Sequence, residues 1–563
     1  MPNKTITGFL RKGKIIGENE TLNDMVLRVF NEISVIEGRY NTPPEELRER
    51  LASLFYEDYI VPSTPILTNA GRHSNKPLAA CSVPHLRKGI TRAELENMIN
   101  DYHQKGMGTG FNLDDSDDPV NELLYLNEIA VREIERNLIE RPVGNLALVS
   151  IDHPKIFDFV SIKSGMLKTI DWKFNIAVNL KRDFMDALAK NENYRLKDGT
   201  TIDTNVLFDF IVEQAYSCGE PGLAFLDRFE EQNITPHLGK YLSLAPCGEI
   251  SMASGEVCQF SYINIGRLFR DNSIDYDLLQ EIVKSTVHML DNILDISIDN
   301  LEDPKSKRMV EQKRKIGIGI CGFSDMLFEL GVPYQSKEAQ LIAEDLLSFI
   351  NYESKKESVE LAKARGAFPA FYDPETRTGL IMGKYIPYET RTVSSGQWEE
   401  LEHEMMQHGI RNVSTVTLPP TGRSSIIINA SASIEPSFRL TVDDKLKRSL
   451  KRNCLRFGYE KDLEPVYQII GETGSVQETD LPEAIKDIYR TCLELTYDAH
   501  LDILSHFQRF TDDSISKTIN MPNDCSRGQV RDACLKADRL ELKGITVYRN
   551  GTRDQPLELA KEK

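Results

Sequence analysis

Two cysteines and a glutamate lie close together in the stretch LSLAPCGEISMASGEVCQFSYINIG, residues 242–266. Glu249 follows Cys247 by two positions, and Cys258 comes eleven positions after Cys247 on the next apolar run. A thiol and a carboxylate held in one small space can combine sulfur chemistry with proton transfer. The alternative is that both cysteines are small buried side chains beside a turn. Other parts of the sequence are needed to decide between these interpretations.

Three loops of small and hydroxyl-bearing residues are candidates for binding an anion. They are VPSTPILTNAG (61–71), GMGTGFN (106–112) and LPPTGRSS (418–425). The first offers the hydroxyls of Ser63 and Thr64, and the third contains Thr421, Gly422, Arg423, Ser424 and Ser425. Backbone N–H groups and hydroxyls in such loops can hold a phosphate, and Arg423 would add a positive charge. An ordinary turn is the alternative for each loop.

Two further patterns match known motifs only in part. GIGICG has the G-x-G-x-x-G spacing of dinucleotide-binding turns, with glycines at 317, 319 and 322, but it follows the charged segment PKSKRMVEQKRK instead of a core strand. We therefore expect close packing of a turn and a helix there. Glu400 and His403 have the i, i+3 spacing of di-iron bundles, but no second E-x-x-H occurs. A solvated helix face is expected, and the sequence predicts no metal site.

The bulk properties exclude several classes of protein. The 563 residues carry 68 basic and 86 acidic side chains, a net charge of −18, which argues against a general nucleic-acid binder. The sequence contains no apolar run of membrane-spanning length, and its N-terminal segment does not resemble a secretion signal. Nine cysteines are too few for a disulfide scaffold, so the cytoplasm is the expected location. Cys525 and Cys534 lie nine residues apart around an expected helix start, and burial is the better explanation for both.

Hydrophobic periodicity predicts the elements that would position these residues. Helical spacing dominates residues 19–60. Later, short β-rich runs alternate with amphipathic segments, as in KFNIAVNL before KRDFMDALAK and QFSYINIG before YDLLQEIVKSTVHMLDNILD. This alternation favours an α/β fold with much parallel sheet, although the order alone does not separate a barrel from an open sheet.

Taken in order, the motifs resemble the large catalytic subunit of ribonucleotide reductases, especially the adenosylcobalamin-dependent class II enzymes. The likeness extends over nearly the whole chain from about residue 45. It comprises the following segments: FYEDYIVPSTPILTNAG, LAACSVP, GMGTGFN, HPKIFDFVSIK, GEPGLAFLDRFEEQNITPHLG, APCGE, VCQFSYINIG, RKIGIGICGFSDMLFELGVPYQSKEA, PPTGRSSIIINASASIEPSF and TINMPND with KGITVYRNGTR.

The resemblance implies a ten-stranded α/β barrel with a central finger loop that carries the radical cysteine. The barrel would occupy residues 61–545, after a small helical region (1–60) and before a polar tail (546–563). Cys247 would carry the thiyl radical and Glu249 would be the general base. Cys81 and Cys258 would be the redox pair that reduces a ribonucleotide. The expected substrate-binding residues are Ser63, Thr64, Ala80, Ala245, Thr421, Gly422, Arg423, Ser424 and Ser425.

The resemblance also implies a radical source and partners. Class I enzymes use adjacent tyrosines, and this chain has no Tyr-Tyr pair, while the segment around Gly551 matches the class II tail better than a glycyl-radical motif. Adenosylcobalamin is therefore the expected cofactor. The expected partners are a ribonucleoside di- or triphosphate, an external dithiol reductant and, as a possible homodimer, a second copy of the chain.

Three features depart from the family pattern. Ala245 stands where the family usually has asparagine, the segment 113–140 is short for an effector site, and the tail DQPLELAKEK lacks a cysteine pair. Two alternatives therefore stay open. One is a radical enzyme of the same fold that acts on another nucleotide or nucleoside, and the other is a non-catalytic nucleotide-binding relative.

Overall fold

Short runs of apolar and glycine residues form two sets of five parallel strands in the computed structural model of the chain. The structure describes residues 4–73, 75–86, 89–139, 143–380, 384–385 and 387–552. The first set is, in spatial order, β2 (Cys81–Ser82), β3 (Gly108–Asn112), β4 (Asn145–Ser150), β5 (Asn175–Asn179) and β8 (Gly222–Ala224). The second is β17 (Gly544–Arg549), β16 (Thr518–Met521), the segment 416–418, β15 (Gly317–Cys321) and the strand formed by β11 (Val257–Cys258) with β12 (Phe260–Asn264).

The two sets meet along two antiparallel seams, which close the sheet into a barrel. At one seam β17 pairs with β8, and at the other β11 pairs with β2. Single bridges between Ile318 and Val416 and between Leu418 and Ile515 connect the segment 416–418 to its neighbours. The predicted ten-stranded α/β barrel is therefore confirmed. An additional short strand, β1 (Ile60–Pro62), pairs antiparallel with β12.

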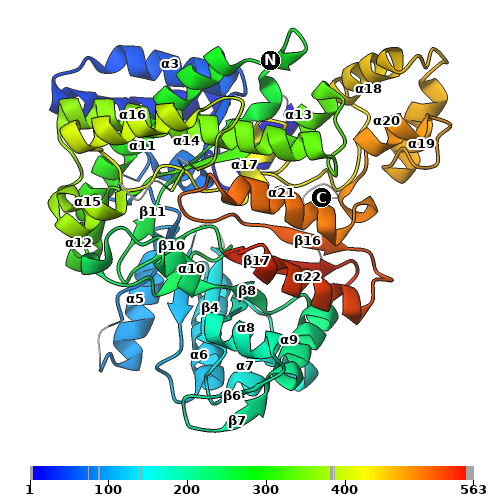
Figure 1. The fold of residues 1–563 in the computed structure, drawn as a ribbon. Coiled ribbons are helices and arrows are strands. Elements are labelled where there is room, and N and C mark those ends of the chain that lie inside the picture. The colour runs from blue at the N-terminus through cyan, green and yellow to red at the C-terminus, as the bar shows by residue number, and fades with distance from the viewer. Residues whose placement is uncertain are drawn as a thin grey trace.

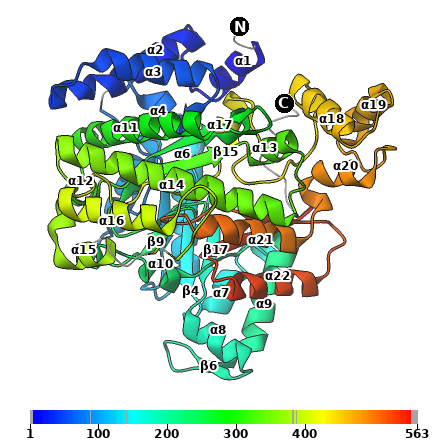
Figure 2. The same cartoon turned by 45° about the horizontal axis from the view of Figure 1, so that its top comes forward.

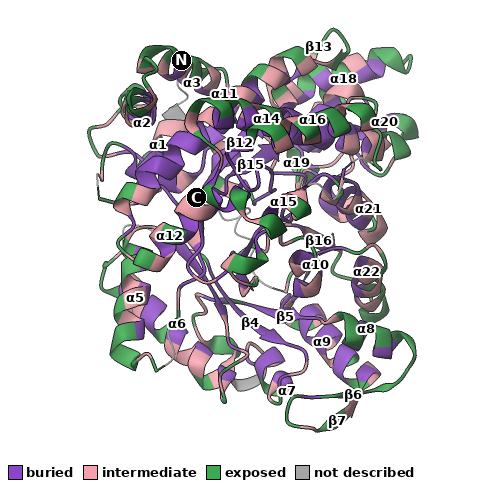
Figure 3. Ribbon diagram, turned by 60° about the vertical axis from the view of Figure 1, so that its left-hand side comes forward, coloured by how far each residue is buried: buried purple, intermediate pink, exposed green. Residues whose placement is uncertain are grey.

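Helices cover the outside of the barrel, as expected when parallel strands are connected by crossovers. Figure 1 shows this layer around the central strands, and Figure 3 shows that the strands are buried while the outer helix faces are exposed. The longer helices are α5 (Arg92–Gln104), α6 (Pro119–Glu135), α9 (Thr204–Cys218), α11 (Tyr276–Asn300), α12 (Pro304–Lys313), α14 (Lys337–Arg365), α16 (Ser395–His408), α21 (Tyr497–Gln508) and α22 (Arg527–Arg539). The shorter ones are α4 (Thr64–Asn69), α7 (Ile156–Val160), α8 (Arg182–Ala189), α10 (Leu226–Glu230), α13 (Phe323–Leu330), α15 (Pro374–Leu380) and α17 (Gly422–Ile427).

Two groups of helices extend this arrangement at the periphery. The N-terminal group is α1 (Lys4–Lys12), α2 (Leu22–Ser34) and α3 (Pro44–Tyr56), which lie together beside α11 in Figure 2. The second is α18 (Asp444–Arg456), α19 (Glu464–Thr473) and α20 (Glu483–Ile488), which share a small core of their own. Among the described helices, none combines the length and the apolar character needed to cross a lipid bilayer.

The expected division at residues 60 and 545 stays a prediction. Helices α1–α3 precede Ile60, and the barrel strand β17 continues through residue 545 to Arg549. Of the expected polar tail, residues 553–563 lie outside the described residues.

A buried ion cluster fixes the N-terminal helices to the barrel wall. Asp291 on α11 is fully buried and pairs with Arg314 at 2.6 Å, Arg365 at 3.1 Å and Arg411 at 3.3 Å. Burial alone would raise the pKa of Asp291, but the three guanidinium groups outweigh it and hold the pKa below its usual value. Arg365 also pairs with the buried Glu37, which follows α2, so one network joins the two parts.

Asp291→Ala should lower the free energy of unfolding by about 3–5 kcal/mol, because it leaves buried guanidinium groups without their counter-charge. Asp299→Ala is the matched control: its partner Arg39 and Asp299 itself are about half exposed, so a change under about 1 kcal/mol is expected. Urea denaturation of both variants measures the difference. Equal losses would contradict the structural role given to Asp291.

Candidate active site

A β-hairpin inside the barrel carries Cys247 at its tip. Strands β9 (Ser243–Leu244) and β10 (Ser251–Met252) pair antiparallel, with Leu244 opposite Ser251. The Ala245 amide donates to the Ile250 carbonyl and the Gly248 amide to the Ala245 carbonyl, both at 2.9 Å. Gly248 has a φ of +78°, which lets the chain reverse directly after Cys247. This hairpin is the predicted finger loop.

Glycines in β3 allow the hairpin to pass close to the barrel wall. A Cβ atom at Gly110 would lie 2.0 Å from the carbonyl oxygen of Leu244, and one at Gly108 would lie 2.5 Å from the carbonyl oxygen of Gly144. Both distances are far below van der Waals contact. The hypothesis that GMGTGFN is an anion-binding loop is therefore wrong for residues 108–112, which form a strand that packs against the finger hairpin.

Cys81 and Cys258 face each other across the seam between β2 and β11. They are partners in the antiparallel register, and the Cys258 thiol lies 3.7 Å from the Cys81 carbonyl oxygen. Neither cysteine forms a disulfide in the structure. Burial raises the pKa of Cys258, and the contact with the Cys81 thiol opposes this only in part. Residues directly opposite in an antiparallel pair are close enough for a disulfide, so the two thiols can form one without large backbone movement.

The Cys247 side chain is open to an internal cavity although protein surrounds it. Burial raises the pKa of this thiol well above its ordinary value, and the nearby charges of Glu249 and Cys81 raise it further. The thiol is therefore protonated at neutral pH. It can give or accept a hydrogen atom, but it is a poor thiolate nucleophile.

Glu249 is a carboxylate in an environment that disfavours its charge. Its side chain is 2% exposed, and within the described residues its Oε2 atom has no hydrogen-bond partner. Burial raises the pKa of Glu249 to about 7, while the backbone N–H groups of Glu249 and Cys247 oppose the shift and Asp513 adds to it. Its backbone carbonyl accepts hydrogen bonds from Thr417 Oγ1 at 2.5 Å and from the Ser514 amide at 3.1 Å. A carboxyl group with a pKa near 7 can both accept and donate a proton at neutral pH.

A cavity of about 560 Å³ opens beside the tip of the finger hairpin. Pro246, Cys247 and Gly248 form one side, and the loop 420–422 forms another. The seam between β8 and β17 supplies much of the rest, including Leu223, Ala224, Ile545 and Thr546. The cavity is large enough for a small organic group next to the Cys247 thiol.

The structure brings part of the predicted phosphate loop to this cavity. Thr421 and Gly422 line it, and the Thr421 hydroxyl accepts a hydrogen bond from the Ser433 amide at 2.8 Å. Ser424 and Ser425 are buried, and the Ser425 hydroxyl donates to the Gly422 carbonyl. Arg423 is exposed.

The other predicted loop lies beside the first. Helix α17, which begins at Gly422, packs against β1, which leads into Ser63. The Ser63 hydroxyl is buried and has no partner in the described part of the chain, while Thr64 is half-buried. Ala80 binds the Cys258 carbonyl through its amide at 2.8 Å, and Ala245 is fully buried at the base of the hairpin turn.

The partial motifs fall outside this constellation. In GIGICG, Gly317 and Gly319 lie in β15, where a Cβ atom at Gly317 would lie 2.5 Å from the Phe260 ring. Gly322 follows the strand with a φ of +85° and leads directly into α13, and a Cβ atom there would lie 2.5 Å from Asn264 Oδ1, so the expected close packing of a turn and a helix holds at Gly322. Glu400 and His403 are exposed on α16. Cys525 is buried just before α22, and Cys534 is buried within this helix. His237, Asp373 and Glu375 come within 4.8 Å of one another near the surface, a grouping common among exposed acidic residues.

Sequence reasoning missed two kinds of residue in the site. Tyr262 on β12 lies four positions after Cys258, a spacing that strand alternation places on the same face. Lys315 and Asp513 contact the hairpin strand β10 from distant parts of the chain. Alternation from Cys258 could have pointed to Tyr262, but no local signal identifies the other two.

Three thiols and one carboxylate gathered around a barrel hairpin are groups that can carry out oxidation and reduction through thiol chemistry. The family profile described as "Ribonucleotide reductase, barrel domain" matches residues 114–548. The chain belongs to the ribonucleotide reductase family.

Individual relatives agree with this assignment. The chain is 31% identical to a vitamin B12-dependent ribonucleoside-diphosphate reductase of Thermoplasma acidophilum, over 95% of this chain and 71% of that protein. It is 28% identical to a protein of the same name from Mycobacterium tuberculosis, over 95% of this chain and 77% of that protein. Its fold is similar to that of the Actinobacillus ureae class Id ribonucleotide reductase alpha subunit, with a TM-score of 0.76 and 18% sequence identity. The match covers 100% of this chain and 98% of that subunit.

Gly110→Ala should displace the finger hairpin, because the added methyl group overlaps the Leu244 carbonyl. We expect activity to fall by at least about 100-fold, since a shift of about 1 Å in a catalytic group has an effect of that size. Gly396→Ala on α16 is the control: a Cβ atom there meets nothing within 4 Å, so activity and stability should be retained. Normal turnover by the Gly110 variant would contradict the packing described for the hairpin.

The rate of the step that uses Glu249 should rise with pH through about pH 7. A carboxyl group acts as a base only when ionised, and burial places its pKa near 7, so more enzyme is active above this value. Single-turnover rates measured from pH 5.5 to 8.5 test this. Glu249→Gln should remove the rising limb and lower the rate by about 10²–10⁴-fold. An unchanged pH profile in that variant would exclude Glu249 as the titrating group.

Proposed function

We propose that this chain is an adenosylcobalamin-dependent ribonucleotide reductase that converts ribonucleoside di- or triphosphates to 2′-deoxyribonucleotides. The observation that carries the proposal is the position of Cys247. It lies at the tip of a hairpin inside the barrel, two residues before a buried base, and the Cys81–Cys258 pair flanks the same space.

The proposed reaction assigns one task to each group. A thiyl radical on Cys247 removes the 3′ hydrogen atom of the ribose while Glu249 takes the proton of the 3′ hydroxyl. The 2′ hydroxyl then leaves as water after protonation by a thiol of the Cys81–Cys258 pair. The pair supplies two electrons and two protons in all and ends as a disulfide. Glu249 returns its proton to the 3′ oxygen, and Cys247 returns its hydrogen atom to the 3′ carbon and is again a thiyl radical.

Residues that line the cavity beside Cys247 would hold part of the cofactor. When bound, adenosylcobalamin supplies a carbon-centred radical capable of one-electron oxidation of a thiol. Apolar wall residues such as Leu146, Ala177 and Leu223 would exclude water, while Thr546 and Asn520 offer polar atoms for a nucleoside group. Two relatives are named vitamin B12-dependent enzymes, which supports this cofactor.

The two neighbouring loops are proposed to hold the phosphates of the substrate. Arg423 is exposed and has no carboxylate partner among the described residues, so its charge is available. Thr64, Thr421 and Ser424, with Ser63 nearby, would supply hydroxyls, and Gly422 and Ser425 would contribute to the same loop. Ala80 and Ala245 would face the nucleotide through the backbone and small side chains. The external dithiol, the homodimer and the cytoplasmic location stay predictions.

An anaerobic assay with adenosylcobalamin, a small dithiol and each ribonucleoside di- and triphosphate tests the proposal. Deoxyribonucleotide should form only when the cobalamin is present. Cys247→Ser should reduce turnover by at least about 1,000-fold, equivalent to about 4 kcal/mol of activation barrier, and should leave nucleotide binding intact.

Cys258→Ser should block repeated turnover because the disulfide cannot form. Cys454→Ala is a control, since Cys454 belongs to the separate core of α18–α20 and should not affect turnover. Nucleotide binding without any deoxyribonucleotide would favour another nucleotide substrate or a non-catalytic relative and would refute the proposal.

A further inference from the structure

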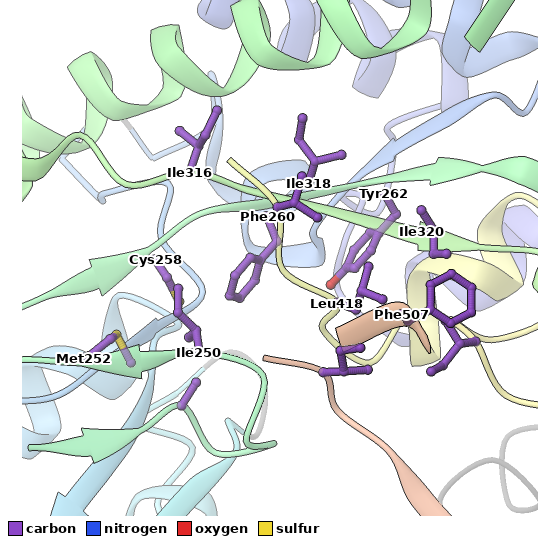
Figure 4. Close-up of a cluster of buried hydrophobic side chains, with 14 of the residues drawn as sticks. Ile250, Met252, Cys258, Phe260, Tyr262, Ile316, Ile318, Ile320, Leu418 and Phe507 are labelled. Carbon is purple, nitrogen blue, oxygen red and sulfur yellow. The ribbon is translucent and has the colours of Figure 1, made fainter. Parts of the chain in front are cut away.

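Tyr262 is a polar side chain that the reaction above does not use, although it lies inside the barrel. Cys258, Phe260 and Tyr262 alternate along β11 and β12, which places their side chains on the interior face of the barrel. Figure 4 shows Phe260 and Tyr262 projecting from β12 toward the barrel centre, above the hairpin residue Ile250. The Tyr262 side chain is 5% exposed.

Close packing fixes the direction of the Tyr262 ring. Gly319 is its partner on β15, and a Cβ atom there would lie 2.9 Å from the ring carbon Cδ1. Val61 is its partner on β1, two residues before Ser63. The ring therefore lies between a glycine that gives it room and the strand that leads into the first substrate loop.

The hydroxyl of Tyr262 reaches the second substrate loop but is weakly held there. It donates to the Pro420 carbonyl at 3.4 Å, long for a hydrogen bond between two oxygens, which is usually near 2.7–2.8 Å. Pro420 lines the cavity beside Cys247 and directly precedes Thr421. Within the described residues the hydroxyl makes no other hydrogen bond, so it can still accept two or exchange its partner.

Tyr262 lies within the electrostatic influence of the four proposed catalytic side chains. Burial raises the pKa of Tyr262 most, and the charges of Glu249, Cys81, Cys247 and Cys258 each raise it further, as expected if all four lie nearby. The hydroxyl thus stays protonated and can donate a hydrogen bond. Position 245 of the finger hairpin offers no equivalent group, because Ala245 has an apolar side chain and its amide is bound to Ile250.

We propose that the Tyr262 hydroxyl binds a ribose hydroxyl of the nucleotide substrate and so helps to distinguish ribonucleotides from sugars that lack this group. The assignment rests on the proposed function, since it requires a ribonucleotide in the space between Cys247 and the two loops. Tyr262 supplies from the barrel wall the hydrogen bond that a polar side chain at position 245 would supply from the hairpin.

Binding measurements without cobalamin test this assignment directly. Equilibrium dialysis of each ribonucleoside diphosphate and its 2′-deoxy and 3′-deoxy counterparts is compared for the original protein and Tyr262→Phe. The variant should bind the ribonucleotide about tenfold more weakly. It should bind the analogue that lacks the contacted hydroxyl within about twofold of the original protein, because that analogue never made the bond.

Controls separate this role from a structural one. Tyr489→Phe also removes a buried hydroxyl, bonded to Asn453 at 2.8 Å in the core of α18–α20, and should leave nucleotide binding unchanged. Combining Ala245→Asn with Tyr262→Phe should restore part of the lost affinity. Equal loss of affinity for all three sugars, or no loss at all, would overturn the assignment. If the original protein bound no nucleotide, both this assignment and the proposed function would fail.

Discussion

The approach of one backbone to another inside the barrel is the constraint on which the site depends. Small barrels are usually filled by side chains, but here a hairpin occupies the centre and carries Cys247. It passes β3 at a distance that no side chain permits, as the overlap at Gly110 shows. The barrel can therefore hold a chemically active segment of main chain in a fixed position, which a flexible surface loop would not provide.

Burial by the surrounding barrel then shifts the protonation equilibria of Cys247 and Glu249. The same removal of water raises the pKa of the Cys247 thiol and brings that of Glu249 to about 7. Such an interior tolerates charges only when they are paired. Lys315 donates to the Ser251 carbonyl at 3.0 Å and lies 3.5 Å from Asp513, which accepts from the Ser251 hydroxyl at 3.2 Å. This buried pair fixes the return strand of the hairpin beside Glu249 while adding no net charge.

The sequence was sufficient for the parts of the site that have local signatures. The order of the cysteines, Glu249 and the two hydroxyl-rich loops carried the family resemblance that implied the barrel and the hairpin, while alternating strand and helix patterns alone predicted an α/β fold. It was insufficient where a residue acts through a distant partner. Gly110 meets Leu244 only in the folded chain, so its segment suggested an anion-binding loop, and Gly317 meets Phe260 within a strand where the sequence predicted a turn. Asp513 contacts Ser251 across 262 residues, which no local pattern reveals.

The two antiparallel seams of the barrel give its interior two chemically different sides. One seam, between β2 and β11, carries Cys81 opposite Cys258, where two thiols can be oxidised together. The other, between β8 and β17, lines the cavity onto which the Cys247 side chain opens. The hairpin tip lies between them. In the proposed reaction, the radical would therefore be generated on the side of the β8–β17 seam, and the two-electron reduction would take place on the side of the β2–β11 seam. Only the sulfur of Cys247 would be in reach of both sides.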